Sequence, residues 1–189
     1  MDLIQEFENV LDKTTCTALI SAFESAPQRQ QRGHTIQGYD PTHKQDTEIR
    51  VDLDLFVLPE WAPLLTSVLV GLKTSIEIYK TQSLGLELIA PWTLLSAFNF
   101  QRYLPGEGYP TLHCEVGGMD STENRVLTWI LYLNDVEDCG ETYFPNQQRK
   151  VSAKQGKLVV APAYWTHCHK GIISPTQTKY ILTGWYGFC

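Results

Sequence analysis

Three side chains that can bind a metal occur in two short segments of the sequence. His113 and Glu115 lie two residues apart in the first segment, and His169 lies in the second. In a β-strand, residues two apart point to the same side, so a strand at 111–115 would direct His113 and Glu115 toward one metal ion. His169 would add a third ligand and leave the remaining coordination positions open.

Two histidines and one carboxylate are the ligand set of non-haem iron(II) oxygenases. The histidine–glutamate pair alone is weak evidence, because chance supplies about half an occurrence in a chain with five histidines and 21 acidic residues. A surface histidine beside a surface glutamate is the ordinary explanation of such a pair. The third ligand also has two candidates, since His167 and His169 share one face of an extended segment.

A lysine inside a late apolar segment adds a second kind of site. Lys179 shares its predicted strand face with Ile181, Thr183 and Trp185. An inward lysine is costly unless an anion pairs with it, although its long side chain can also carry the charge to water at a strand end. Beside a metal, capture of a dicarboxylate co-substrate explains the lysine better, with the Tyr103 hydroxyl donating to the same anion.

Other residues and motifs narrow the chemistry. Arg125 precedes an apolar strand and either binds substrate or pairs with Glu123, and the second interpretation is slightly favoured. The sequence has no GxSxG elbow, P-loop or dinucleotide-binding GxGxxG.

Composition favours one domain, residues 1–189, in the cytoplasm. The net charge of −6 argues against non-specific nucleic-acid binding. An acidic start without a signal-peptide pattern, and no apolar run of membrane-spanning length, argue against export and membrane insertion. The five cysteines form no CxxC pair, so we expect free thiols, with Cys114 and Cys168 acting as small buried apolar residues.

The first part of the chain, about residues 1–83, is expected to form a supporting helical layer. Asp12 has the position of an N-cap for a helix that Pro27 ends. A second helix is expected to have Pro59 and Pro63 in its first turn, where proline is tolerated, and to run to about Thr81.

The remaining segments predict strands and one polar loop. Residues 28–48 form the loop, which is a candidate substrate lid, and 49–56 alternates as a half-buried strand does. Over about residues 84–189, the predicted strands are 94–103, 111–115, 126–133, 141–144, 157–161 and 179–186. Helices followed by many short strands predict an α+β, mainly β fold: a double-stranded β-helix (jelly roll) with supporting N-terminal helices.

Several motifs, in order, resemble one known family. The sequence resembles the Fe(II)- and 2-oxoglutarate-dependent oxygenases of the prolyl 4-hydroxylase-like branch over about residues 98–188. The resemblance lies in QRYLPGEGYPTLHCE, in RVLTWILYLND followed by CGETYF, in GKLVVAPAYWTHCHKG and in TKYILTGWY. This combination is more specific than any single segment.

The resemblance implies that His113, Glu115 and His169 bind iron. It favours His169 over His167, because the ten-residue distance to Lys179 and the His-Lys-Gly sequence match the family. The usual carboxylate of the family is aspartate, and the glutamate here is one methylene longer. The presence of any carboxylate disfavours the halogenase variant, in which chloride takes that position.

The resemblance also implies a reaction. Lys179 would bind the distal carboxylate of 2-oxoglutarate with help from Tyr103 and Thr183, and Arg125 and Trp185 are candidates for substrate contact. The enzyme would use Fe(II), O2 and 2-oxoglutarate, with ascorbate as an accessory reductant, to hydroxylate a substrate and release succinate and CO2. The substrate is either a peptide, with a prolyl residue as the natural target, or a small molecule such as a free amino acid.

Two other classes remain open. A cupin-type metal protein would work as an isomerase or as a dioxygenase without 2-oxoglutarate, and Lys179 would then hardly matter. A non-catalytic binding jelly roll would show no tight stoichiometric iron site.

Overall fold

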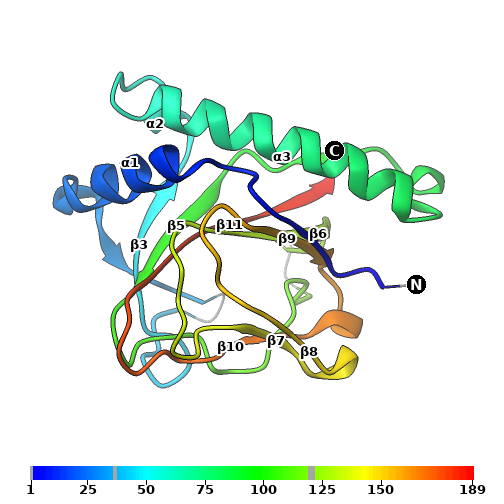
Figure 1. Ribbon diagram of the computed structural model, residues 1–189. Helices are drawn as coiled ribbons and strands as arrows, with labels where there is room; N and C mark the ends of the chain where they lie inside the picture. The colour runs from blue at the N-terminus through cyan, green and yellow to red at the C-terminus, as the bar shows by residue number, and fades with distance from the viewer. Residues whose placement is uncertain (1, 36–37, 119–121) are drawn as a thin grey trace.

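Two β-sheets face each other, and helices cover the outer side of the larger one (Figure 1). The computed structural model describes residues 2–35, 38–118 and 122–189. The described strands of the larger sheet run in the order β1-β9-β6-β11-β5-β3-β2, with β4 paired to β11, and those of the smaller sheet run β10-β7-β8. The predicted jelly roll with supporting helices is confirmed.

The strand bounds follow the predicted alternation closely in the second half of the chain. The larger sheet consists of β1 (Gln5–Phe7), β2 (Gln31–Arg32), β3 (Thr47–Val51), β4 (Trp92–Leu94), β5 (Phe98–Tyr103), β6 (Arg125–Tyr132), β9 (Leu158–Pro162) and β11 (Lys179–Phe188). The smaller sheet consists of β7 (Thr142–Phe144), β8 (Arg149–Val151) and β10 (Lys170–Gly171). Three of these strands, β1, β2 and β3, come from the part of the chain that was expected to be helical support.

Three predicted strands are wrong in part or in whole. The strand predicted at 49–56 ends at Val51, because the Asp52 carboxylate accepts the Asp54 amide at 3.2 Å and starts the short helix α2 (Leu53–Phe56). The strand predicted at 111–115 is absent, and this described segment instead forms one isolated bridge between His113 and His169. The predicted strand 94–103 is divided into β4 and β5.

Both predicted long helices are present, and the second begins after Pro59, which was predicted to lie in its first turn. Helix α1 (Lys13–Glu24) starts after Asp12, whose carboxylate accepts the Thr15 amide at 2.7 Å. Helix α3 (Ala62–Gln82) has Pro63 in its first turn. Figure 1 shows both helices lying across the larger sheet. Their apolar faces meet Phe100 of β5, whose ring centroid lies 4.7 Å from that of Phe23.

Alternation along the central strands separates the hydrophobic core from a cavity between the sheets. In β5, Phe98 and Phe100 point to the helices, while Gln101 and Tyr103 line the cavity. In β11, Leu182 joins the core, and the cavity-lining residues of this strand are Lys179, Ile181, Thr183 and Trp185. The face predicted for Lys179 is therefore confirmed.

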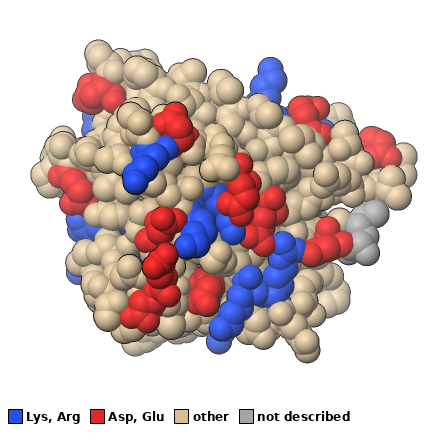
Figure 2. Space-filling view, in the orientation of Figure 1, with Lys and Arg blue, Asp and Glu red and all other residues tan. Residues whose placement is uncertain are grey.

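Charged side chains of both signs are interspersed on the face shown in Figure 2. Arg149 of β8 bonds to Glu6 of β1 at 2.6 Å, and Lys157 bonds to the same carboxylate at 2.8 Å. The Arg149 pair connects an edge of the smaller sheet to an edge of the larger one. Within the described residues, no helix has both the length and the apolar character needed to cross a bilayer.

Phe100→Ala tests the helix–sheet contact. Phe100 is fully buried between α1 and the N-terminal end of α3, so its truncation should lower the free energy of unfolding by about 3–5 kcal/mol. Val70→Ala on the exposed face of α3 is the matched control and should change it by less than about 0.5 kcal/mol. Urea unfolding followed by circular dichroism measures both, and equal effects would contradict this description of the core.

Candidate active site

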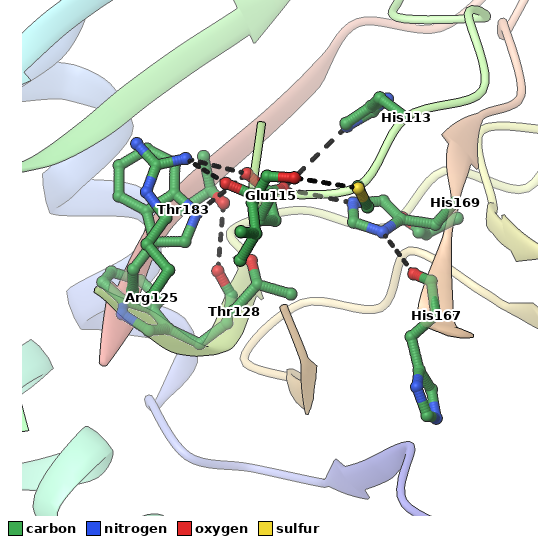
Figure 3. Close-up of polar contacts among 12 residues, drawn as sticks. His113, Glu115, Arg125, Thr128, His167, His169 and Thr183 are labelled. Atoms are coloured by element: carbon green, nitrogen blue, oxygen red, sulfur yellow. Dashed lines mark hydrogen bonds and ion pairs between the residues drawn. The ribbon is translucent and has the colours of Figure 1, made fainter. Parts of the chain in front are cut away.

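His113, Glu115 and His169 converge at one end of the cavity (Figure 3). Glu115 Oε1 lies 3.3 Å from His169 Nε2 and 3.9 Å from His113 Nε2, and one ligand atom of each residue lies within 4.8 Å of the others. Two backbone hydrogen bonds between His113 and His169, at 3.0 and 2.8 Å, hold the two segments together. A backbone bond from Glu115 to Ala163 O at 3.0 Å fixes the carboxylate-bearing residue.

Both imidazole rings direct Nε2 toward Glu115. His113 Nδ1 lies 2.8 Å from Thr111 O, and His169 Nδ1 lies 3.1 Å from His167 O. A carbonyl oxygen only accepts, so each neutral ring carries its proton on Nδ1 and keeps the Nε2 lone pair free. Burial and, to a smaller extent, His169 lower the pKa of His113 to about 4, which favours the neutral, metal-binding form.

The second oxygen of Glu115 is occupied by two donors. Trp185 Nε1 donates to Oε2 at 2.8 Å, and Arg125 Nη1 lies 3.4 Å from the same atom. Burial raises the pKa of Glu115, but the neighbouring His169, with smaller contributions from His113 and Trp185, outweighs burial and brings it to about 2. The carboxylate is thus ionised, with Oε1 directed to the histidines.

The structure separates the two histidines that the sequence left ambiguous. Figure 3 shows the His167 ring pointing away from Glu115. Its Nδ1 lies 3.0 Å from Thr166 Oγ1, and its carbonyl accepts from His169. His167 therefore orients the ring of His169 and stays outside the cluster.

The ligand types fit an iron(II) ion. Two neutral imidazole nitrogens and one carboxylate oxygen are the donor set that suits this metal in oxygenases. The Nδ1–H groups of both histidines donate to backbone carbonyls. Glu115 Oε2 accepts from the indole of Trp185 and the guanidinium of Arg125. Side chains that bind a metal usually have such partners. The ring of Tyr109 also stacks on that of His113, with centroids 3.8 Å apart.

Lys179 lies in the same cavity, which has a volume of about 320 Å³. Its ammonium group donates to Gly140 O at 3.0 Å and lies 5.1 Å from the centre of the Tyr103 ring. Burial lowers the pKa of Lys179 to about 8, partly offset by Glu141, so the group is mainly protonated at neutral pH. No carboxylate of the described residues forms an ion pair with it.

Three other predicted residues bond to neighbouring groups of the protein. The Tyr103 hydroxyl donates to Gln101 Oε1 at 3.0 Å, and Thr183 Oγ1 donates to Trp129 O at 3.0 Å. Arg125 pairs with Glu115 rather than Glu123, so the favoured interpretation of Arg125 is corrected. Its guanidinium carbon also lies 3.6 Å from the centre of the Trp185 ring.

The sequence analysis missed a charged cluster in the cavity wall. Lys44, from the predicted lid, is buried and donates to Glu48 Oε2 at 3.1 Å. Its ammonium group also lies 3.2 Å from Asp46 Oδ2, although neither oxygen of that carboxylate accepts a hydrogen bond from a described residue. One lysine thus faces two buried carboxylates. The i, i+2 spacing of these residues, leading into β3, is the sequence signal that would have identified the cluster. Residues 36 and 37 of the predicted lid lie outside the described residues.

Comparison with known families gives the chemistry of the fold. The family model of the 2OG-Fe(II) oxygenase superfamily matches residues 98–187, which include all three converging side chains. Residues 98–187 of this chain are therefore similar to the 2OG-Fe(II) oxygenase superfamily. The resemblance predicted from the sequence is confirmed, and so are Fe(II) and 2-oxoglutarate as the cofactor and co-substrate of the family. Among curated proteins, no sequence matches the chain.

Solved structures share the fold over nearly the whole chain. The viral collagen prolyl hydroxylase of Paramecium bursaria Chlorella virus-1, solved with 2OG, is 18% identical, with a TM-score of 0.72 and coverage of 100% of this chain and 97% of that one. A Pseudomonas putida prolyl-4-hydroxylase is 19% identical (TM-score 0.72; coverage 98% and 92%). A Trichoplax adhaerens prolyl hydroxylase in complex with a hypoxia inducible factor peptide fragment is 16% identical (TM-score 0.76; coverage 99% and 84%).

Asp46→Asn tests the excess of negative charge around Lys44, which faces two carboxylates. Burial raises the pKa of Asp46 to about 6, Lys44 offsets part of this, and Glu48 adds to it. A carboxyl group whose pKa is raised by folding binds more protons in the folded state, so its stabilising contribution is lost as pH rises through the folded pKa. Between pH 5 and pH 7, wild type should therefore lose about 1 kcal/mol of unfolding free energy relative to Asp46→Asn.

Urea unfolding of both proteins at the two pH values measures this difference. Glu60→Gln, at an exposed position, is the control and should follow wild type. Parallel pH profiles for wild type and Asp46→Asn would show that the buried carboxyl group does not titrate in this range.

Proposed function

We propose that this chain is an Fe(II)- and 2-oxoglutarate-dependent hydroxylase of a prolyl residue in a peptide, with iron held by His113, Glu115 and His169. One observation carries the proposal: two histidines with free Nε2 atoms and one ionised carboxylate meet beside a buried lysine in a single cavity. The bound iron, with 2-oxoglutarate and O2, supplies the oxidant that converts a substrate C–H bond to C–OH and releases succinate and CO2.

The residues of the chain orient the reactants and exclude water. Lys179 has three N–H donors, and only one is used by Gly140 O, so two remain for the distal carboxylate of 2-oxoglutarate. The pairing is strong because the ammonium group is buried. Thr183 and Ile181 follow on the same strand face and separate this carboxylate from the metal end. The Tyr103 ring covers the lysine, and its hydroxyl needs only to rotate from Gln101 to reach the anion.

The peptide approaches from the cavity wall formed by the predicted lid. This wall includes Lys44 and Glu48 of the predicted lid, and next to them Arg50 of β3, which is exposed at the surface. The proposal of a peptide is supported by the likeness to prolyl hydroxylase folds, one of which was solved with a peptide. A cytoplasmic location is supported by the five free cysteines, since a reducing compartment keeps thiols unpaired.

His169→Ala should remove stoichiometric metal binding, whereas His167→Ala should retain it. The first substitution removes a direct ligand, and the second removes a ring that points away from the site. Anaerobic calorimetric titration with Fe(II) measures binding, and succinate release from 2-oxoglutarate with a proline-containing peptide measures turnover. We expect no detectable turnover for His169→Ala and at least about a tenth of the wild-type rate for His167→Ala.

These two variants also separate the competing functions. Stoichiometric iron binding without 2-oxoglutarate consumption by wild type would favour a cupin-type metal protein. No iron binding would favour a non-catalytic jelly roll and would refute the proposal.

Lys179→Met should raise the dissociation constant of 2-oxoglutarate by about 30-fold or more, because loss of one partner of a buried charge pair costs about 2 kcal/mol or more. Fe(II) binding should be unchanged, since Lys179 is not one of the three converging side chains. Lys179→Arg should restore part of the affinity, and Lys80→Met on the surface of α3 is the control. Calorimetry on Fe(II)-loaded protein without O2 gives these constants, and an unchanged affinity for Lys179→Met would refute this role.

A further inference from the structure

Cys114 and Cys168 occupy facing positions next to the two histidines of the site. His113 and His169 exchange both of their backbone hydrogen bonds in an isolated antiparallel bridge. One step along an antiparallel pair from such a position lies a non-hydrogen-bonded pair, whose side chains are closer together. Cys114 follows His113 and Cys168 precedes His169, so the two cysteines are that next pair.

The geometry of this pair suits a disulfide. Facing residues of a non-hydrogen-bonded pair have Cα atoms about 4.5 Å apart, and a disulfide accepts about 4.4–6.8 Å. Facing side chains also lie on one side of a pair, so the two thiols are directed to the same side.

Both cysteines are accessible to a small oxidant. Each is partly exposed, which corrects the expectation that they are buried, and Cys114 lines the cavity. The other three differ in setting. Cys16 is a fully buried residue of α1, and Cys139 and Cys189 lie on the surface.

We propose that Cys114 and Cys168 form a reversible dithiol–disulfide pair that responds to peroxide. A hydroperoxide oxidises one thiol to a sulfenic acid and is itself reduced to water or an alcohol. The second thiol attacks the sulfenic sulfur, the S–S bond forms and a water molecule leaves. The two thiols lose two protons and two electrons in total, and the peroxide takes them up. A small dithiol reverses the reaction by exchange.

The disulfide joins the segment that carries His113 and Glu115 to the segment that carries His169. A cross-link limits how far the segments that it joins can separate. Release of a bound metal requires these ligands to move apart, so the oxidised protein should lose its metal more slowly than the reduced protein. This consequence for the metal rests on the proposed function, whereas formation of the disulfide does not.

The test uses the full chain with Cys139→Ser and Cys189→Ser, which removes the two surface thiols. The reduced protein is treated with a small excess of hydrogen peroxide without added metal, unfolded, alkylated and digested with trypsin. We expect a cross-linked pair of the tryptic peptides 103–125 and 158–170, and loss of two of the three remaining thiols. Dithiothreitol should regenerate both peptides. Higher oxides of cysteine in unlinked peptides, or chain-to-chain disulfides alone, would overturn the proposal.

Single substitutions provide the control and the metal readout. Cys114→Ser and Cys168→Ser should each abolish the linked peptide and leave the other cysteine as a sulfenic acid that dimedone traps. Circular dichroism checks that both variants are folded. Removal of Co(II) by a chelator should be several-fold slower for oxidised than for reduced protein, and equal rates would overturn the effect on the metal. Failure of both forms to bind Co(II) or Fe(II), with the linked peptide still present, would count against the proposed function alone.

Discussion

The pair of backbone hydrogen bonds between His113 and His169 is the constraint on which the site depends. The two residues belong to segments that lie far apart in the chain, and neither segment is part of a regular sheet at this position. Because each residue both donates and accepts, the pair fixes register as well as distance. Register places the two histidines opposite each other and does the same for the two neighbouring cysteines. A shift of one residue would break both pairings.

Among the buried charged side chains described in the cavity, Lys179 has no oppositely charged partner. Glu115 has Trp185 and Arg125 on one oxygen and the imidazoles on the other. Lys44 lies beside two carboxylates, so the negative charge there exceeds the positive charge. Lys179 has only the neutral carbonyl of Gly140 within hydrogen-bond distance among the described residues. A buried ammonium group without a counter-ion is unfavourable, so the fold retains this lysine at a cost that an anionic co-substrate would offset.

The sequence predicted those parts of the site that lie on regular strands. The face of β11 that carries Lys179 follows from alternation alone. The convergence of His113 and Glu115 was predicted for an incorrect reason, because a loop held by one bridge directs them, and no strand does. The Lys44 cluster was missed because burial of this polar segment depends on pairing of β3 with β5, a long-range contact that local composition does not reveal.

The glutamate at position 115 also determines where substrate can approach. An aspartate is one methylene shorter, whereas Glu115 reaches both the histidines with Oε1 and the Trp185 indole with Oε2. Trp185 and the stacked Arg125 are therefore held against the ligand carboxylate, and they act first by positioning it. The indole N–H and the guanidinium are then largely used within the protein. Under the proposed function, recognition of the substrate would then depend more on Glu48 and Arg50 of β3, which line the same cavity.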